Sequence, residues 1–383
     1  MKVLQGQPVN LDYPIIGRVS RNGGWLCLRK DTIYVSEQIR GNLWGYTGIV
    51  VEQSANEVRF KSGKPSVFGL SSADLAFLQE GDVILLEPSG LVTVVWDADS
   101  PHNSIFVTDT CNCKCIICPQ PGRADQKDYL PFNLRILKLV KARSVSHIGI
   151  TGGEPTLKPE VLRTILKFCR VRFPSATISL LTNGKRFEDL EFTRSIAEIG
   201  HPGLVYCVSL YSDTDTEHDR IVGTPGSFRQ TVKGLHNLAL FRQPVEIRIV
   251  IFRNNYQRLP SMAEFIFRNF PFVVHVAFMG MECTGLASTN LDQVWIDPTE
   301  YALELKAAVL HLNRRAIPVS IYNLPLCLIP QEVWGFSKNS ISTWKNIYLE
   351  QCKDCRMRAN CGGFFSTSVK QSNRITPIKN EGG

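Results

Sequence analysis

The feature that most constrains the fold is an alternation that begins near residue 102. Apolar, strand-like runs occupy residues 104–110, 147–151, 177–183, 204–212, 245–252 and 273–280. Amphipathic stretches separate them at residues 130–142, 159–173, 187–200, 227–241 and 259–270, and another follows at 297–315. Apolar strands alternating with helices predict parallel βα units whose sheet is covered by helices. Six such units favour an α/β fold of the partial (β/α)6 barrel type over a flat doubly wound sheet, and chemistry is expected on the loops after the strands.

Two helix starts carry local signals. Ser227 and Gln230 have the spacing of a capping box and predict a helix that begins at about residue 227. Asp297, followed by Pro298 and Glu300, predicts the cap of the helix in 297–315.

The first hundred residues have a different pattern. Short strand-like runs at 32–37, 47–52, 58–62, 66–70, 82–88 and 91–97 are separated by Gly, Asn, Pro and Ser. The last two of these runs predict a hairpin with its turn near Ser89 and Gly90. We therefore expect three parts: a small β-rich domain at 1–101, the barrel at 102–315, and a cysteine-rich extension at 316–383.

Composition narrows the class of protein. Hydrophobic residues make up 44% of the chain and charged residues 20%, as in globular proteins. No apolar run approaches the roughly 18 to 20 residues of a membrane span, and the N-terminus lacks a signal-peptide core, so we expect a cytoplasmic protein without a membrane partner. The formal charge of +8 comes from scattered Lys and Arg, which favours a solvated basic surface over a nucleic-acid site.

Twelve cysteines are many for a cytoplasmic chain, where disulfides are disfavoured. Five stand alone and are expected to be mostly buried core thiols. They are Cys27, Cys169, Cys207, Cys283 and Cys327. The other seven form two tight groups and are candidate metal ligands. They are Cys111, Cys113, Cys115, Cys118, Cys352, Cys355 and Cys361.

The first group lies on the loop after the first barrel strand. Cys111, Cys115 and Cys118 have the spacing C-x3-C-x2-C, and thiolates this close can converge on one metal centre. Zinc and iron–sulfur cubes both usually take four protein ligands, so three thiolates leave one corner of a cube free. Cys113 is a possible fourth ligand, but on a tight loop we expect its side chain to point away.

This spacing resembles that of the radical S-adenosylmethionine (radical SAM) superfamily, in which the free iron of a [4Fe–4S] cluster binds SAM. A second match follows the next strand, where the sequence has Gly152, Gly153 and Glu154. Glycines let a backbone approach a ligand closely, and a carboxylate accepts hydrogen bonds from an ammonium group. The resemblance implies reductive cleavage of SAM to a 5′-deoxyadenosyl radical, with the protein supplying orientation and shelter.

Softer matches extend the predicted SAM site. Asn183 resembles a residue near the methionyl group in relatives, and Ser209 resembles a polar contact to the ribose or carboxylate. Arg220 is a candidate contact to the SAM carboxylate, with a surface role as the alternative. Arg248 alternates with apolar residues and is expected to point into the barrel. No residue of the catalytic proton or radical chemistry is assigned.

The C-terminal cysteines resemble the auxiliary-cluster region of peptide-modifying radical enzymes, the SPASM and twitch type. Cys352, Cys355 and Cys361 give C-x2-C-x5-C, and Cys327 is the predicted fourth ligand of one auxiliary [4Fe–4S] cluster. The fuller SPASM pattern has another cysteine where this chain has Phe365. A zinc site on the same thiolates is the alternative, and Cys283 is either an alternative ligand or a loop thiol.

Both cysteine regions together most resemble the His-Xaa-Ser system radical SAM maturases, C-type. That resemblance implies a peptide or small protein substrate, a reductant such as flavodoxin or ferredoxin, and a companion maturase. Two alternatives stay open. One is a radical SAM enzyme that acts on a nucleoside or RNA, which should show a basic stripe or an aromatic stacking platform. The other is a non-enzymatic iron–sulfur or zinc scaffold, which leaves the Gly-Gly-Glu turn unexplained.

Overall fold

The computed structural model describes residues 3–21, 29–52, 63–123, 127–339 and 345–379. Contacts divide the chain into two compact units, Met1–Ile105 with Tyr129–Ile148, and Phe106–Asp128 with Gly149–Gly383. None of the helices in the described residues is long and apolar enough to cross a membrane.

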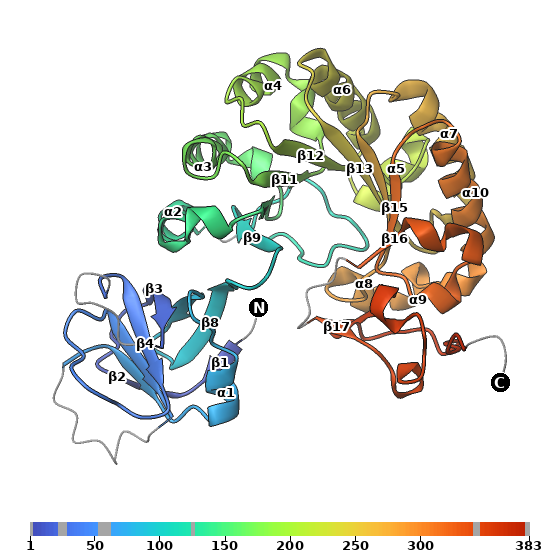
Figure 1. The fold of residues 1–383 in the computed structure, drawn as a ribbon. Helices are drawn as coiled ribbons and strands as arrows, with labels where there is room; N and C mark the ends of the chain where they lie inside the picture. The colour runs from blue at the N-terminus through green and yellow to red at the C-terminus, as the bar shows by residue number, and fades with distance from the viewer. Residues whose placement is uncertain (1–2, 22–28, 53–62, 124–126, 340–344, 380–383) are drawn as a thin grey trace. The chain divides into compact units, whose positions relative to one another are not determined.

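The first unit is built on an eight-stranded sheet of order β1-β8-β7-β3-β4-β5-β6-β2 (Figure 1). The strands are β1 (Val3–Gln5), β2 (Gln7–Val9), β3 (Ile15–Ser20), β4 (Thr32–Ser36), β5 (Gly48–Val51), β6 (Ser66–Phe68), β7 (Val83–Leu86) and β8 (Leu91–Trp96). The predicted strand at 58–62 lies outside the described residues. β7 and β8 form the predicted antiparallel hairpin, and the short helix α1 (Ser72–Ala76) precedes it.

The N-terminal segment closes this sheet on itself. β1 pairs antiparallel with β8, whereas β2 pairs antiparallel with β6 at the other end of the strand order. Gly6 alone separates the two, and a Cβ there would lie 2.5 Å from Val67 Cγ1. Residues 3–9 therefore join both ends of the sheet and enclose one apolar core, which includes Ile33, Val67 and Ile84.

The second sheet has the order β16-β15-β14-β13-β12-β11-β10-β9. Its strands are β9 (Asn103–Phe106), β10 (His147–Thr151), β11 (Thr177–Thr182), β12 (Leu204–Ser209), β13 (Val245–Ile251), β14 (His275–Gly280), β15 (Val319–Tyr322) and β16 (Ser337–Lys338). Pairing is parallel from β11 through β16. The α/β prediction is confirmed, and each of the six predicted strands is present. β15 and β16 add two more strands, so the extension predicted from residue 316 begins by enlarging this sheet.

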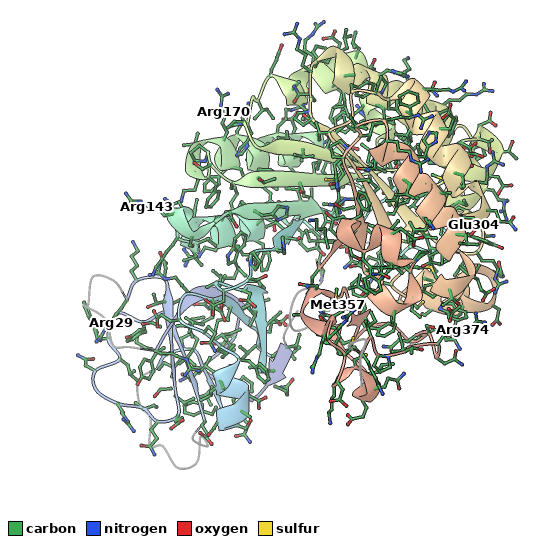
Figure 2. All side chains as sticks on the ribbon, turned by 45° about the vertical axis from the view of Figure 1, so that its right-hand side comes forward. Arg29, Arg143, Arg170, Glu304, Met357 and Arg374 are labelled. Carbon is green, nitrogen blue, oxygen red and sulfur yellow. The ribbon has the colours of Figure 1, made fainter. Side chains whose placement is uncertain are left out.

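Helices follow the strands as the periodicity predicts. They are α2 (Leu130–Leu139), α3 (Pro159–Arg172), α4 (Leu190–Ala197), α5 (Asp215–Val222), α6 (Ser227–Leu240), α7 (Leu259–Asn269), α8 (Leu286–Thr289), α9 (Leu291–Val294) and α10 (Ala302–Asn313). Figure 2 shows Arg170 of α3 and Glu304 of α10 on the outer side of their helices. The opposite faces bury apolar side chains, such as Leu166 and Leu305, against the sheet.

The two predicted helix caps differ in outcome. Asp297 caps only the short 3-10 turn Pro298–Glu300, where its carboxylate accepts from Thr299 N at 3.0 Å, whereas the N-cap of α10 is Tyr301, which makes no side-chain cap. The capping box at Ser227 is wrong, since Gly226 is the N-cap and makes no side-chain cap. The Asp219 carboxylate instead accepts from Gly226 N and Phe228 N at 2.5 and 2.7 Å. That arrangement leaves the Ser227 side chain free to turn inward, where it is fully buried.

Candidate active site

A cavity of about 1480 Å³, including the part open to solvent, lies at the carboxyl ends of the parallel strands. Thr151, Thr182, Ser209 and Gly280 line it, and each is the last residue of its strand. Polar side chains at the carboxyl ends of parallel strands are where α/β folds place ligands. The cavity is therefore the candidate active site.

All four cysteines of the first group line this cavity. Cys111, Cys115 and Cys118 are brought together as predicted, although their role as ligands stays a prediction. Cys113 does not point away from them. Its sulfur accepts from Asn183 Nδ2 at 3.5 Å and lies 3.9 Å from Lys185 Nζ.

The thiols interact strongly with one another. Hydrogen bonds from Cys111 and Cys115 lower the pKa of Cys113, and the same bonds, with burial, raise the pKa values of Cys111 and Cys115. Burial also raises the pKa of Cys118. The loop thus concentrates four thiols that a cationic metal centre would hold as thiolates.

The Gly-Gly turn packs against the loop that carries these cysteines. Gly153 N donates to Thr108 O at 2.7 Å, and Glu154 N donates to Thr110 O at 2.8 Å. A Cβ on Gly152 would lie 2.7 Å from Thr108 O, and one on Gly153 would lie 2.2 Å from Thr110 O. The backbone approach expected toward a ligand is in this structure an approach to the cysteine loop itself.

Glu154 is buried and holds neighbouring strand ends together. One carboxylate oxygen accepts from Thr156 N, Thr156 Oγ1 and Thr182 Oγ1 at 3.0, 2.7 and 2.7 Å, and the other accepts from Asn183 N at 2.7 Å. Burial raises the pKa of Glu154, and these four hydrogen bonds oppose that shift. Oε2 has the capacity for a further donor, so the predicted contact to a SAM ammonium group remains compatible with the geometry.

Of the remaining residues that were predicted near SAM, some line the cavity and one does not. Asn183 and Ser209 line the cavity. Arg220 is not among the described residues that line it, and its guanidinium pairs with Glu217 at 2.7 Å on the exposed side of α5. Arg248 lines the cavity, as its position in an alternating strand suggested. Ile117, which follows Ile116 in the cysteine loop, packs in an apolar cluster with Phe252.

Several cavity residues were not predicted from the sequence. Lys185 is buried, and its ammonium group lies 3.4 Å from Asn112 O. His218 accepts from Tyr211 N at 3.3 Å, and burial lowers its pKa to about 4. Ser227 Oγ is buried against the cavity, where its interaction with the Cys113 thiol helps to lower the pKa of Cys113. The sequence assigned Ser227 to a capping box and so gave no sign of its place in the cavity. No motif marked Lys185 or His218.

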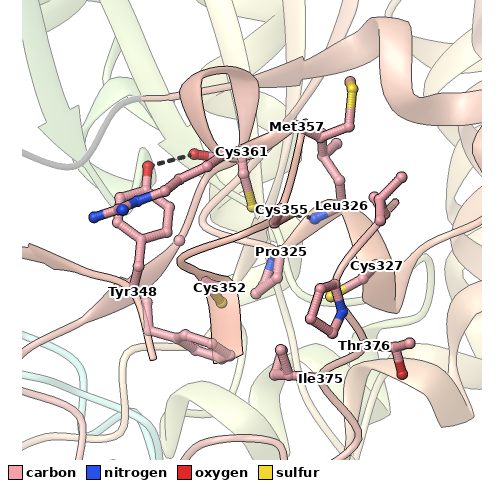
Figure 3. A pocket seen from close by; sticks show the side chains of 15 residues that line it. Pro325, Leu326, Cys327, Tyr348, Cys352, Cys355, Met357, Cys361, Ile375 and Thr376 are labelled. Atoms are coloured by element: carbon pink, nitrogen blue, oxygen red, sulfur yellow. Dashed lines mark hydrogen bonds between the residues drawn. The ribbon is translucent and has the colours of Figure 1, made fainter. Parts of the chain in front are cut away.

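The C-terminal cysteines surround a second, smaller cavity of about 370 Å³ (Figure 3). Cys327, Cys352, Cys355 and Cys361 all line it, so the predicted partner Cys327 is brought to the group. Leu326 N donates to Cys361 Sγ at 3.4 Å, and Tyr348 OH donates to Cys361 O at 2.9 Å. Cys283 is buried but is not among the described residues lining either cysteine cavity.

Neither group has the arrangement of a single-ion site. Tetrahedral zinc with bonds near 2.3 Å requires sulfurs roughly 3.8 Å apart. Among the described residues, no three His, Cys, Asp or Glu side chains converge in that way. A cube binds each thiolate to a different iron, and the number of cysteines that line each cavity suffices for the ligands of a [4Fe–4S] cluster.

Comparison with known proteins identifies the domain. Residues 105–266 match the family model of the Radical SAM superfamily. This segment holds the first cysteine group, the Gly-Gly-Glu turn and strands β10 to β13. The chain therefore carries a radical SAM domain.

Among individual relatives, the chain is 26% identical over 152 residues to a probable GTP 3′,8-cyclase of Pyrococcus abyssi, covering 39% of this chain and 47% of that protein. It is 22% identical over 284 residues to a probable GTP 3′,8-cyclase of Thermoplasma volcanium, covering 72% and 82%. The chain thus spans about half the length of the first of these relatives.

Solved structures give weaker matches. Streptococcus suis SuiB bound to SAM matches at a TM-score of 0.46 and 16% identity, over 58% of this chain and 50% of that one. A radical SAM methyltransferase from Sphaerobacter thermophilus matches at a TM-score of 0.45 and 14% identity, over 63% and 73%.

Proposed function

We propose that this protein is a radical SAM enzyme that modifies a peptide or small protein substrate. Cys111, Cys115 and Cys118 would hold the [4Fe–4S] cluster, and the Gly-Gly-Glu turn, Asn183 and Ser209 would contact SAM. The chemistry that such a cluster supplies to bound SAM is one electron, which cleaves a carbon–sulfur bond to give a 5′-deoxyadenosyl radical.

The residues of this chain position the reactants and exclude water. The Gly152–Gly153 turn fixes the cysteine loop through backbone hydrogen bonds. Lys185 lies against the same loop at Asn112 O. Apolar side chains, among them Val250, Met279 and Phe365, line the cavity and limit water around a reactive radical.

The charge of the cavity is the observation that favours a peptide over a nucleoside triphosphate. Among the described lining residues the cations are Lys185 and Arg248, and the carboxylates are Glu154 and Glu282. A triphosphate binds where several cationic groups converge. A lining with balanced charge suits a substrate that is close to neutral, such as a peptide segment.

The second cavity supports an auxiliary [4Fe–4S] cluster on Cys327, Cys352, Cys355 and Cys361. Four cysteines around one small cavity match the ligand number of such a cluster. Zinc on the same four thiolates is the alternative. In the His-Xaa-Ser maturase proposal, flavodoxin or ferredoxin would supply electrons and a companion maturase would assist.

The test is anaerobic reconstitution with iron and sulfide, followed by dithionite, SAM and a peptide of His-Xaa-Ser repeats. We expect 5′-deoxyadenosine above the blank and a change in peptide mass that requires both SAM and reductant. Cys118→Ala should abolish both products. No 5′-deoxyadenosine from the wild-type protein would defeat every radical SAM proposal and leave the scaffold alternative.

A nucleoside substrate is the second candidate function, and the GTP 3′,8-cyclase relatives favour it. The same reconstituted protein should then be given GTP in place of the peptide. A SAM-dependent change in the GTP nucleoside, without modification of the peptide, would replace the peptide proposal.

A further inference from the structure

A chain of hydrogen bonds crosses three neighbouring strands below the active-site cavity. Arg248 Nε donates to Glu246 Oε1 at 2.5 Å within β13. His275 Nδ1 of β14 lies 2.8 Å from Glu246 Oε2, and its Nε2 lies 2.9 Å from Ser320 Oγ of β15. Both oxygens of Glu246 are thus engaged, and the Arg248 guanidinium is held in one orientation.

Arg248 also faces the cavity. Burial alternates along β13, so that Glu246, Arg248 and Val250 share one face, and the last two line the cavity. The Arg248 side chain is 27% exposed. Its Nε is bonded to Glu246, its one hydrogen-bond partner among the described residues. The part of the guanidinium available to a ligand is therefore its pair of terminal nitrogens.

From this geometry we propose that Arg248 binds a carboxylate of the substrate on the floor of the cavity. This inference rests on the proposed function and adds a specificity determinant to it. Two terminal guanidinium nitrogens match the two oxygens of a carboxylate in a bidentate pair. Glu246 and His275 act as positioning residues because they fix the orientation of this fork. A C-terminal or side-chain carboxylate of a peptide has the required chemistry.

The position of Arg248 within β13, outside the cysteine loop, is the reason for assigning this carboxylate to the substrate. Arg248 lies three residues before the end of β13, about 10 Å along the strand from the end where the cysteine loop lies. Its neighbours in register are Ala277 and Ser209, the last residue of β12 and a proposed SAM contact, so a carboxylate held by Arg248 would lie beside SAM. The radical formed from SAM must act on a molecule next to it, and this position suits that substrate.

The electrostatic surroundings of Arg248 also differ from those of the residues beside the cysteine loop. Among the groups that raise the pKa of Arg248, Glu246 is the one that is ionised at neutral pH, because burial raises the pKa values of Cys207 and Tyr322. The cysteines of the loop act instead on Tyr211 and His218, whose pKa values they raise. Burial would raise the pKa of Glu246, but His275 and Arg248 lower it to about 2, so this carboxylate stays ionised beside Arg248.

Matched pairs of probes test the proposal on the reconstituted, SAM-loaded full chain by calorimetry. The first pair is N-acetyl-His-Gly-Ser as the free acid and as the C-terminal amide. The second pair is 3-phenylpropionate and 3-phenylpropionamide, which carry no peptide feature. We expect the acid of each pair to bind at least about tenfold more tightly than its amide, as the loss of one charged bidentate contact predicts. Arg248→Gln should remove this preference, and Arg248→Lys should retain only part of it.

The surface variant Arg268→Gln is the control, because Arg268 pairs with Glu264 on the outside of α7. It should keep the wild-type preference. Should Arg248→Gln fail to fold because Glu246 loses its partner, the double variant Arg248→Gln/Glu246→Gln removes both charges together. Ser320→Ala should weaken the acid preference without changing SAM affinity, because it loosens His275 and not the cysteine loop.

The outcomes separate two claims: the carboxylate site at Arg248 and the peptide substrate of the proposed function. A preference that depends on Arg248 for phenylpropionate but not for the peptide supports the carboxylate site and counts against the peptide substrate. Equal binding of acid and amide in both pairs overturns the proposal. Loss of SAM affinity in Arg248→Gln, with the acid preference unchanged, also overturns it, because Arg248 would then serve the SAM carboxylate.

Discussion

Glu154 accepts a hydrogen bond from the backbone N–H of Asn183 at 2.7 Å, which ties the turn after β10 to the turn after β11. The same carboxylate accepts three further hydrogen bonds from Thr156 and Thr182. Glu154, which is expected to contact SAM, therefore also holds the two turns together at the rim of the cavity.

Glu154→Gln should destabilise the protein as well as reduce SAM binding. The NH2 group of the new amide would face N–H or O–H donors that now bond to a carboxylate oxygen of Glu154. The free energy of unfolding is expected to fall by about 2 to 3 kcal/mol. Urea unfolding of the apo protein measures it. Glu160→Gln on the exposed start of α3 is the matched control and should shift the midpoint little. An unchanged midpoint in Glu154→Gln would mean that the hydrogen bonds of Glu154 do not contribute to stability.

Gly153→Ala should separate the turn from the cysteine loop. Its Cβ would lie 2.2 Å from Thr110 O and 2.9 Å from Asp109 O, both backbone atoms that cannot move alone. We expect about 1 to 3 kcal/mol of destabilisation, together with reduced iron incorporation at the adjacent site. Gly335→Ala is the control, because a Cβ there meets no atom within 4 Å. Normal iron content in Gly153→Ala would contradict the coupling of turn and loop.

Cys113 and Cys115 should differ in the effect of substitution by alanine. If three thiolates hold the first cube, Cys115→Ala should lower iron from about eight to about four per chain, and Cys113→Ala should leave it near eight. Iron and sulfide assays after anaerobic reconstitution provide the measurement. Iron lost equally in both variants would make Cys113 a ligand, which its position among the other thiols permits.

The C-terminal cavity gives a parallel expectation. The double variant Cys352→Ala/Cys355→Ala should also lower iron from about eight to about four per chain. Cys283→Ala is the control, because Cys283 is not among the described residues lining that cavity. Zinc in the wild-type tail, with iron near four from the outset, would replace the auxiliary cluster with a zinc site.

His218 should make the stability of the protein depend on pH between about 4 and 6.5. Burial lowers its pKa from 6.5 to about 4 in the folded protein, so the unfolded chain binds more protons in this range. Its contribution to stability is complete above pH 6.5 and is lost as pH falls toward 4, which amounts to about 2 kcal/mol at pH 5. Urea unfolding at pH 5 and pH 7 should show this difference in the wild-type protein.

The matched variants are His218→Gln and His236→Gln. His218→Gln can still accept from Tyr211 N and should flatten the pH dependence, whereas the exposed His236→Gln should retain it. A wild-type slope that persists in His218→Gln would assign the effect to other groups.

The local signals in the sequence were most reliable where they depend on a repeated pattern. Apolar runs and helical periodicity predicted the six strands and their helices, because a buried parallel sheet requires that alternation whatever the details of packing. The capping box failed because two residues at the right spacing do not reveal a competing group. Asp219, from the preceding helix, supplies the cap in place of Ser227.

The sequence by itself determined the alternating α/β architecture, the two cysteine groups and the glycine turn, since each is written in residues that are close along the chain. Only the tertiary structure decided that Cys113 faces the cavity and that Arg220 is not among the described residues that line it. It also brought Arg248, Glu246, His275 and Ser320 into one chain of hydrogen bonds. These contacts join three parallel strands that are connected through long helical crossovers, so no tight turn in the sequence fixes which residues of the three strands lie side by side.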